Sequence, residues 1–224
     1  SLIKEYEQRL VDAPENLKLI RSLAELHSRV KNFDKSIGYY ERFNKTNLRS
    51  DAAVDRAIVD TKLLQFDWRI KQAGQGDAGE LEVERNAFEM DQIRRLSDTY
   101  PSDLSLRYDL GVLQFKAGEI TLAIQSFQRP QANPHKEIPS LMQMGKCFAK
   151  RGMNDMAAGT LQKALDKKEI MDDEKIDLHY QLGCVLDSMD RAGESIDQFK
   201  LIYERDIGYR DVAERVDTYY ANLA

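Results

Sequence analysis

The feature that most restricts how this chain can fold is a pattern of small and large residues that recurs at a nearly fixed spacing. Gly111, Gly145 and Gly183 each follow a large apolar residue within an amphipathic run, and they lie 34 and 38 residues apart. A small side chain stands twelve residues after each glycine and a bulky one sixteen residues after it. These residues are Ala123 and Phe127, Ala157 and Leu161, and Ser195 and Phe199. Self-similarity at this period predicts repeated helical hairpins.

The repeat has a physical origin in how short helices bury apolar surface. One pair of short helices cannot cover its own apolar stripe, whereas stacked pairs share one extended core. The spacing therefore predicts small residues where the two helices of a pair approach closely and bulky residues between neighbouring pairs. Gly118 and Gly152, seven residues after the reference glycines, indicate turns. Further copies are indicated at Leu23–Ala24, with Ser36 and Tyr40 at the same offsets, and in part at Val216–Asp217.

The apolar periodicity predicts an all-α chain. Regular helices are expected at 1–12, 17–30, 34–46, 104–117, 120–129, 137–151, 154–167, 173–188, 192–205 and 209–222. Pro130 and Pro134 are expected to cut one second helix short, because proline cannot donate to the preceding turn.

Residues 48–103 depart from the regular spacing. Ala24 and Gly111 are 87 residues apart, which exceeds two 34-residue repeats by 19. The segment is interpreted as two long helices, 50–72 and 80–99, joined by residues 73–79. If each helix gains two turns, the pair projects about 10 Å beyond its neighbours. The stripes that support this interpretation are Val54, Ala57, Ile58, Thr61, Leu64 and Trp68, and Phe88, Ile93, Leu96 and Tyr100.

The joining segment contains a G-x-G-x-x-G string at residues 74–79, which in other settings marks a dinucleotide site. That fingerprint requires a β-strand before the glycines and a helix after them. Here the preceding run is helical and charged, and Glu80, Glu82 and Glu84 would repel a pyrophosphate. The string is interpreted as the tip of a helical hairpin.

The offsets around Gly111, Gly145 and Gly183 resemble those of the tetratricopeptide repeat family, whose unit is a 34-residue helix-turn-helix. The resemblance implies a right-handed α-solenoid of antiparallel helix pairs. Two departures stand out, since Asp190 replaces an inter-helix glycine and the usual aromatic residue near the start of the first helix is missing. Its places hold Ile20, Arg107, Leu141 and His179. With the long hairpin and the run Asp206–Asp211, the chain is similar to bacterial members of unassigned role.

The resemblance also implies how the chain is organised. We expect a single solenoid over residues 1–224, and no separate domains. Residues 1–47 would hold the second helix of a partial repeat and one full repeat, and 48–103 the enlarged hairpin. Residues 104–206 would hold three regular repeats, and 207–224 a terminal half-repeat or capping helix.

Family members bind extended peptides or partner helices along a concave surface formed by the first helix of each pair. Carried over by offset, Tyr108, Met142 and Tyr180 would form an apolar row flanked by lysines. The full predicted groove is Arg21, Glu25, Tyr108, Val112, Phe115, Lys116, Met142, Lys146, Lys150, Tyr180 and Asp187. The clamp that binds chaperone tails in some members needs Lys and Asn at these places, and Tyr108, Val112, Met142 and Lys146 do not supply them.

These observations predict a non-catalytic scaffold that binds a protein or peptide through the groove, the projecting hairpin or both. The alternative is a structural module that self-assembles into homo-oligomers. A third possibility, RNA binding by helical repeats, requires a basic groove. The net charge of -5 disfavours it, because phosphate binding needs clustered Lys and Arg. The same acidity disfavours an anionic membrane surface.

No catalytic, metal or cofactor site is predicted. Cys147 and Cys184 form no C-x-x-C pair and are interpreted as small buried hydrophobes. His27, His135 and His179 lie in different segments without metal-ligand spacing. No apolar run is long enough to span a bilayer and no signal peptide pattern is present, which favours a cytoplasmic location. The chain starts within an expected helix, as a piece of a longer protein would.

Overall fold

The computed structural model describes residues 1–49 and 51–222. Within them the chain forms twelve α-helices, one short 3-10 helix and no strand, which confirms the all-α prediction. The chain divides into two compact units, unit 1 from Ser1 to Pro101 and unit 2 from Ser102 onward. The single continuous solenoid expected over residues 1–224 therefore stays a prediction.

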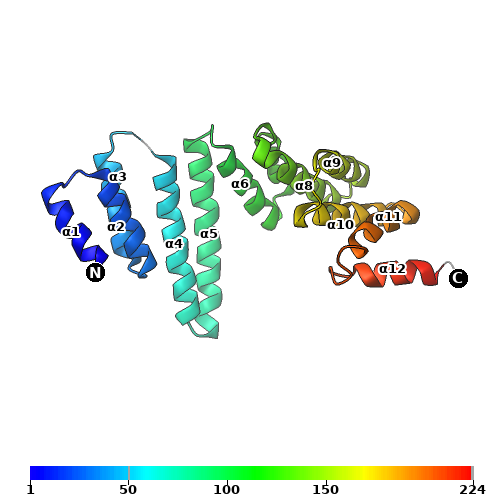
Figure 1. The fold of residues 1–224 in the computed structure, drawn as a ribbon, viewed down its shortest axis with the longest axis horizontal. Helices are drawn as coiled ribbons and strands as arrows, with labels where there is room; N and C mark the ends of the chain where they lie inside the picture. The colour runs from blue at the N-terminus through cyan, green and yellow to red at the C-terminus, as the bar shows by residue number, and fades with distance from the viewer. Residues whose placement is uncertain (50, 223–224) are drawn as a thin grey trace. The chain divides into compact units, whose positions relative to one another are not determined.

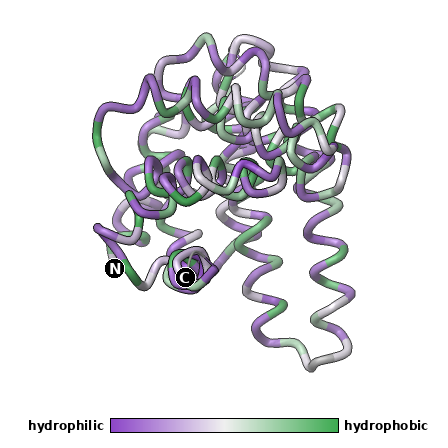
Figure 2. Tube along the Cα trace, turned by 90° about the vertical axis from the view of Figure 1, so that its right-hand side faces the viewer, coloured by the Kyte–Doolittle hydropathy of each residue, from purple (hydrophilic) through white to green (hydrophobic). Residues whose placement is uncertain are grey.

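Both units consist of antiparallel helices that follow one another in sequence (Figure 1). Unit 1 holds α1 (Leu2–Asp12), α2 (Leu17–Arg29), α3 (Phe33–Thr46), α4 (Ala52–Gln72) and α5 (Gln75–Thr99). Unit 2 holds α6 (Leu104–Lys116), α7 (Ile120–Gln128), the 3-10 helix η1 (Pro130–Ala132), α8 (Pro134–Lys150), α9 (Asn154–Lys167), α10 (Asp173–Asp187), α11 (Ala192–Tyr203) and α12 (Val212–Ala221). Hydrophilic and hydrophobic residues alternate around these helices, as Figure 2 shows.

The reference glycines lie where the two helices of a pair touch. A Cβ atom built on Gly145 would lie 2.6 Å from Cγ of Leu161, so no larger residue fits without a shift. Gly111 meets Phe127 and Gly183 meets Phe199 in the same way. The spacing predicts that these bulky residues lie between neighbouring pairs. In the structure each of them contacts the glycine of its own pair. Each reference glycine and the bulky residue sixteen positions after it thus form one contact, which is repeated in α6–α7, α8–α9 and α10–α11.

The turn inside each regular pair has one backbone conformation. Lys31, Gly118, Gly152 and Asp190, all seven residues after the reference position, have φ values of 61°, 79°, 73° and 57°. The N–H of the following residue bonds the carbonyl five residues before it, as Met153 does with Phe148 at 2.9 Å. This is the bonding of a Schellman helix end. Asp190 therefore makes the same turn as a glycine, because Asp tolerates the left-handed region.

The long hairpin of unit 1 extends past its neighbour, as predicted. Helix α4 has 21 residues and α5 has 25, whereas α3 has 14. Gln65 donates to Asp34 near the start of α3 at 3.0 Å, and beyond this level α4 and α5 continue alone (Figure 1). Phe66 and Phe88, with ring centroids 5.8 Å apart, hold the two long helices together.

Two details of the predicted hairpin are wrong. The joining segment is not a seven-residue loop, because α5 begins at Gln75 and Gly74 is its N-cap. Leu64 and Trp68 are 50% and 41% exposed, since α4 packs against both α3 and α5 and its apolar residues divide between two faces. Buried in their place are Val59, Leu63 and Phe66.

Prolines set the local structure around α8. Helix α7 ends at Gln128 and Pro130 opens η1, which confirms the predicted short second helix. Helix α8 begins at Pro134 and not at residue 137, because proline is tolerated in a first turn and Asn133 accepts the N–H of His135 at 3.0 Å. Helix α12 begins at Val212 and not at residue 209, since Arg210 has a φ of 47° that interrupts a helix.

Candidate partner-binding surface

In unit 2 the first helices of successive pairs, α6, α8 and α10, lie next to one another, with α8 in contact with both others. Their common side is called the first-helix surface. Nine of the eleven residues predicted to bind a partner lie on these three helices: Tyr108, Val112, Phe115, Lys116, Met142, Lys146, Lys150, Tyr180 and Asp187. Arg21 and Glu25 lie on α2 in unit 1, where they form an ion pair of 3.2 Å.

The apolar side chains of this surface are rooted in the core. The ring of Tyr108 meets Phe127 edge-on at 5.5 Å between centroids, and burial raises the pKa of its hydroxyl. Val112, Phe115 and Met142 are half-buried against the same core cluster. Side chains anchored in this way are held in place and still present part of their surface, as binding anchors do.

The predicted lysines differ in exposure and in ion pairing. Lys116 and Lys150 are exposed, and neither has an ion pair within the described residues. Lys146 is half-buried, and its Nζ lies 3.0 Å from a carboxylate oxygen of Asp177 on α10. The positive charge open to a partner therefore comes from the exposed pair.

Asp177 is the centre of a charge network at the junction of α8, α10 and the loop before α12. Arg210 lies 2.9 Å from it, opposite Lys146. Burial would raise the pKa of Asp177, but hydrogen bonds from Gln181 and Lys146 and the charges of Lys146 and Arg210 lower it below its ordinary value. The carboxylate is thus held in its charged form.

Tyr180, like Tyr108, is half-buried, and the same loop contacts it. Its hydroxyl donates to Asp211 at 2.8 Å, and the guanidinium of Arg210 lies 4.4 Å above its ring. Burial, and then the bond to Asp211, raises the pKa of Tyr180 to about 12. Arg215 bonds both Asp211 and Asp187, at 2.9 and 3.3 Å. The loop before α12 and α12 itself are thus joined to α10 through Tyr180 and Asp187, whereas on α6 the ring of Tyr108 has Lys136 Nζ 4.6 Å from its centroid.

No protein-family profile and no curated protein matches the sequence of this chain. Solved structures do match its fold. The protein YrrB, described as a TPR protein with an unusual peptide-binding site, is 15% identical with a TM-score of 0.64, over 93% of this chain and 96% of that one. The chain has the tetratricopeptide-repeat fold.

Two further neighbours agree with this fold. MamA from Desulfovibrio magneticus RS-1 is 15% identical with a TM-score of 0.59, over 84% of this chain and 93% of that one. Cut9, from the APC/C hetero-tetramer Cut9–Hcn1, is 13% identical with a TM-score of 0.54, over 97% of this chain and 45% of that one. The tetratricopeptide resemblance predicted from the residue offsets is thereby confirmed.

Sequence reasoning missed part of the first-helix surface of this tetratricopeptide fold. Asp177 lies six residues before the reference glycine of its copy, an offset that the predicted groove does not include. It nevertheless pairs with the predicted residue Lys146. Arg210, Asp211 and Arg215 follow the last regular pair. Arg210 and Asp211 lie in the run that is interpreted from the sequence only as a likeness to bacterial members. No offset within one repeat shows that a later loop contacts Tyr180.

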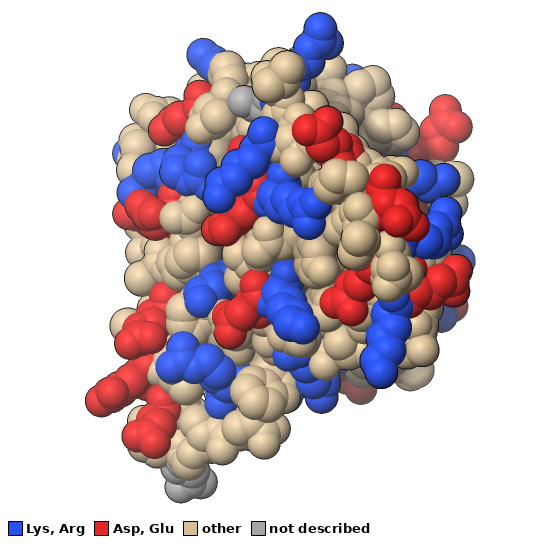
Figure 3. Space-filling model, turned by 90° about the vertical axis from the view of Figure 1, so that its left-hand side faces the viewer, with Lys and Arg blue, Asp and Glu red and all other residues tan. Residues whose placement is uncertain are grey.

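Charges of both signs are interspersed on the face seen in Figure 3. Among the described residues no group of three or more His, Cys, Asp or Glu side chains could hold a metal ion. His27 and His179 are buried and His135 is exposed. Cys147 is buried, and burial raises the pKa of its thiol to about 11; Cys184 is half-buried. No helix in the described part of the chain has the length and apolar character to cross a membrane.

Proposed function

We propose that this chain is a scaffold that binds a peptide or protein segment on the first-helix surface of unit 2, without catalysis. The observation that carries the proposal is the row of half-buried Tyr108, Val112, Phe115 and Met142 on adjacent helices. Unpaired Lys116 and Lys150 lie on the same two helices, in their last turns. The row offers apolar anchoring and the lysines offer charge, which together favour an acidic segment with apolar side chains.

The fold supports a binding role in general. YrrB has a peptide-binding site and Cut9 is part of a hetero-tetramer, which shows that this fold can serve binding and assembly in other proteins. The residues expected for a chaperone-tail clamp are missing here. A cytoplasmic location remains part of the proposal.

A charge-reversal experiment tests the proposed surface. We expect Lys116→Glu/Lys150→Glu to lower recovery of bound protein from a cell extract about tenfold, because like charges repel an acidic segment. Lys163→Glu/Arg205→Glu is the matched control, since both residues are exposed and lie off this surface. Equal recovery with both variants would exclude the proposed surface.

Self-assembly is the alternative function. Sedimentation velocity over a wide range of protein concentrations separates the two, because a homo-oligomer dissociates on dilution. We expect a sedimentation coefficient that does not change with concentration. An RNA-binding role would instead appear as salt-sensitive retention of RNA on a filter.

A further inference from the structure

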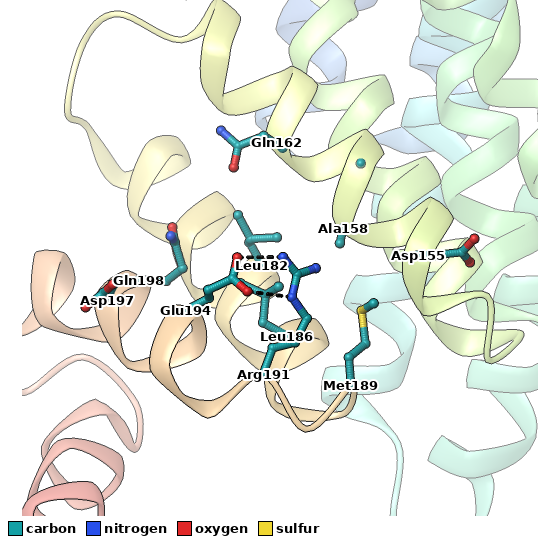
Figure 4. Close-up of a pocket in the computed structure, with 11 residues that line it drawn as sticks. Asp155, Ala158, Gln162, Leu182, Leu186, Met189, Arg191, Glu194, Asp197 and Gln198 are labelled. Carbon is teal, nitrogen blue, oxygen red and sulfur yellow. Dashed lines mark hydrogen bonds and ion pairs between the residues drawn. The ribbon is translucent and has the colours of Figure 1, made fainter.

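Unit 2 has a second candidate surface, which none of the predicted residues touches. A cavity of about 520 Å³ lies between α9 and α11, with α10 beneath it (Figure 4). It is called the second-helix groove, after the second helices that form its walls. Its volume lies within the range of about 300–1,000 Å³ typical of ligand sites.

The floor of the second-helix groove is apolar. Ala158, Leu182 and Leu186 are 8%, 3% and 4% exposed, and Met189 is half-buried beside them. Figure 4 shows the two leucines between the walls. The floor therefore presents a narrow apolar strip to an occupant, and Met189 is its most exposed member.

The walls have helical spacing. Helix α9 contributes residues 155, 158, 159 and 162, and α11 contributes 194, 197 and 198. The stripe on α9 runs from residue 155 to residue 162, a rise of about 10 Å along the helix. Two walls of this length and an apolar floor match a short helix that inserts side chains at positions i, i+3 or i+4, and i+7.

The rim is acidic. Asp155 and Asp197 are exposed on opposite walls (Figure 4). Asp155 has no ion pair or hydrogen bond within the described residues, and Asp197 reaches only Lys200, at 3.9 Å. Arg191 and Glu194 neutralise each other through two bonds of 2.7 and 2.5 Å. Three carboxylates and one guanidinium leave a formal rim charge of -2.

The groove is also open to close approach. Gly159 lies on α9 in helical conformation, and a Cβ atom built on it would meet no atom within 4 Å. Unlike Gly145, it is not required for packing within its helix pair. A larger residue at this position would project into the groove without disturbing the core.

We propose that the second-helix groove docks a basic amphipathic helix of another protein. Its apolar stripe would lie on Leu182 and Leu186, and its Lys or Arg side chains would face Asp155 and Asp197. This charge preference is opposite to that of the first-helix surface, so the inference does not rest on the proposed function. A second copy of this chain fits less well, since its net charge is -5.

The probe is a synthetic fluorescent helix of about four turns. It carries Leu at i, i+4 and i+7 on one face and Lys on both flanks. A second peptide has Glu in place of Lys, and a third has the Lys sequence scrambled so that no apolar face forms. Fluorescence anisotropy with the full chain measures the three dissociation constants. We expect the Lys helix to bind about tenfold more tightly than either control.

Two variants test the location of binding. Gly159→Arg should weaken binding of the Lys helix at least tenfold, because it fills the groove and adds positive charge; Gly38→Arg is the matched control. Gly38 is also an exposed helical glycine with nothing near its Cβ position, and it lies in unit 1. Asp155→Lys/Asp197→Lys should reverse the preference, so that the Glu helix binds more tightly.

Three outcomes would overturn the proposal. The first is equal binding of the Lys and scrambled peptides, and the second is Lys-helix binding that survives Gly159→Arg. The third is self-association of the chain that Gly159→Arg abolishes, because the occupant would then be a second copy. Lys116→Glu/Lys150→Glu leaves the groove intact. Its effect on extract proteins therefore tests the first-helix surface separately.

Discussion

At the scale of single residues, three glycines with the same local sequence pattern perform one packing task, which the helical Gly159 does not share. Gly111, Gly145 and Gly183 each leave room for a bulky side chain of the partner helix. Gly159 is likewise helical but faces open space. Only the first kind recurs with a bulky apolar residue sixteen positions later.

We predict opposite effects for two alanine substitutions on one helix pair. Gly145→Ala should lower the free energy of unfolding by about 1–3 kcal/mol, because the new methyl group overlaps Leu161. Gly159→Ala should raise it by up to about 1 kcal/mol, since alanine is the better helix former and nothing obstructs it. Urea unfolding of the full chain, followed by circular dichroism, gives both values. A stabilised Gly145→Ala variant would contradict the close contact.

At the scale of elements, the long hairpin shows how far local pattern can mislead. Three glycines within six residues indicate a flexible tip, yet α5 starts at Gln75 and includes Gly76 and Gly79. Neither glycine has the left-handed backbone that Gly118 and Gly152 show. Glycine composition alone did not reveal this, because a helix tolerates glycine when its partner helix, here α4, holds it along much of its length.

This boundary can be tested at the two helical glycines. Gly76→Ala/Gly79→Ala should stabilise the start of α5 by up to about 1 kcal/mol per residue, because alanine loses less backbone entropy in a helix. Slower amide hydrogen exchange over residues 76–84 would report it. The control is Gly118→Ala, which should be destabilising because its φ is 79°. Faster exchange in the double variant would favour the original loop interpretation.

At the scale of the whole molecule, charge is arranged to join successive elements as well as to meet partners. Lys146, Asp177 and Arg210 connect α8, α10 and the loop before α12. Asp211 and Arg215 extend this network to Asp187. The end of unit 2 is therefore held by ion pairs that are half-buried at Lys146 and Asp177 and more exposed at Arg210 and Asp187.

The network makes unit 2 sensitive to acid. The pKa of Asp177 is lower in the folded chain than its ordinary value of 3.8. Its contribution to stability is therefore fully present above that pH and is lost as the pH falls through the lower, folded-state pKa. We expect Asp177→Asn to be destabilising at neutral pH, by an amount that shrinks below about pH 4. Urea unfolding at a series of pH values measures it, and a difference that is constant with pH would contradict the role of this carboxylate.

The sequence by itself determined the helical class, the repeating pair contact and the turns, because these depend on residues close together in the chain. It also placed nine partner-binding candidates on the first helices α6, α8 and α10, since a repeat carries each offset from pair to pair. Only the tertiary structure shows which candidates are contacted by side chains of other elements. Tyr180 and Lys146 are occupied by groups from the next helix or loop, and the second-helix groove needs three helices at once. Such arrangements depend on how whole pairs pack, and no spacing within one repeat encodes that.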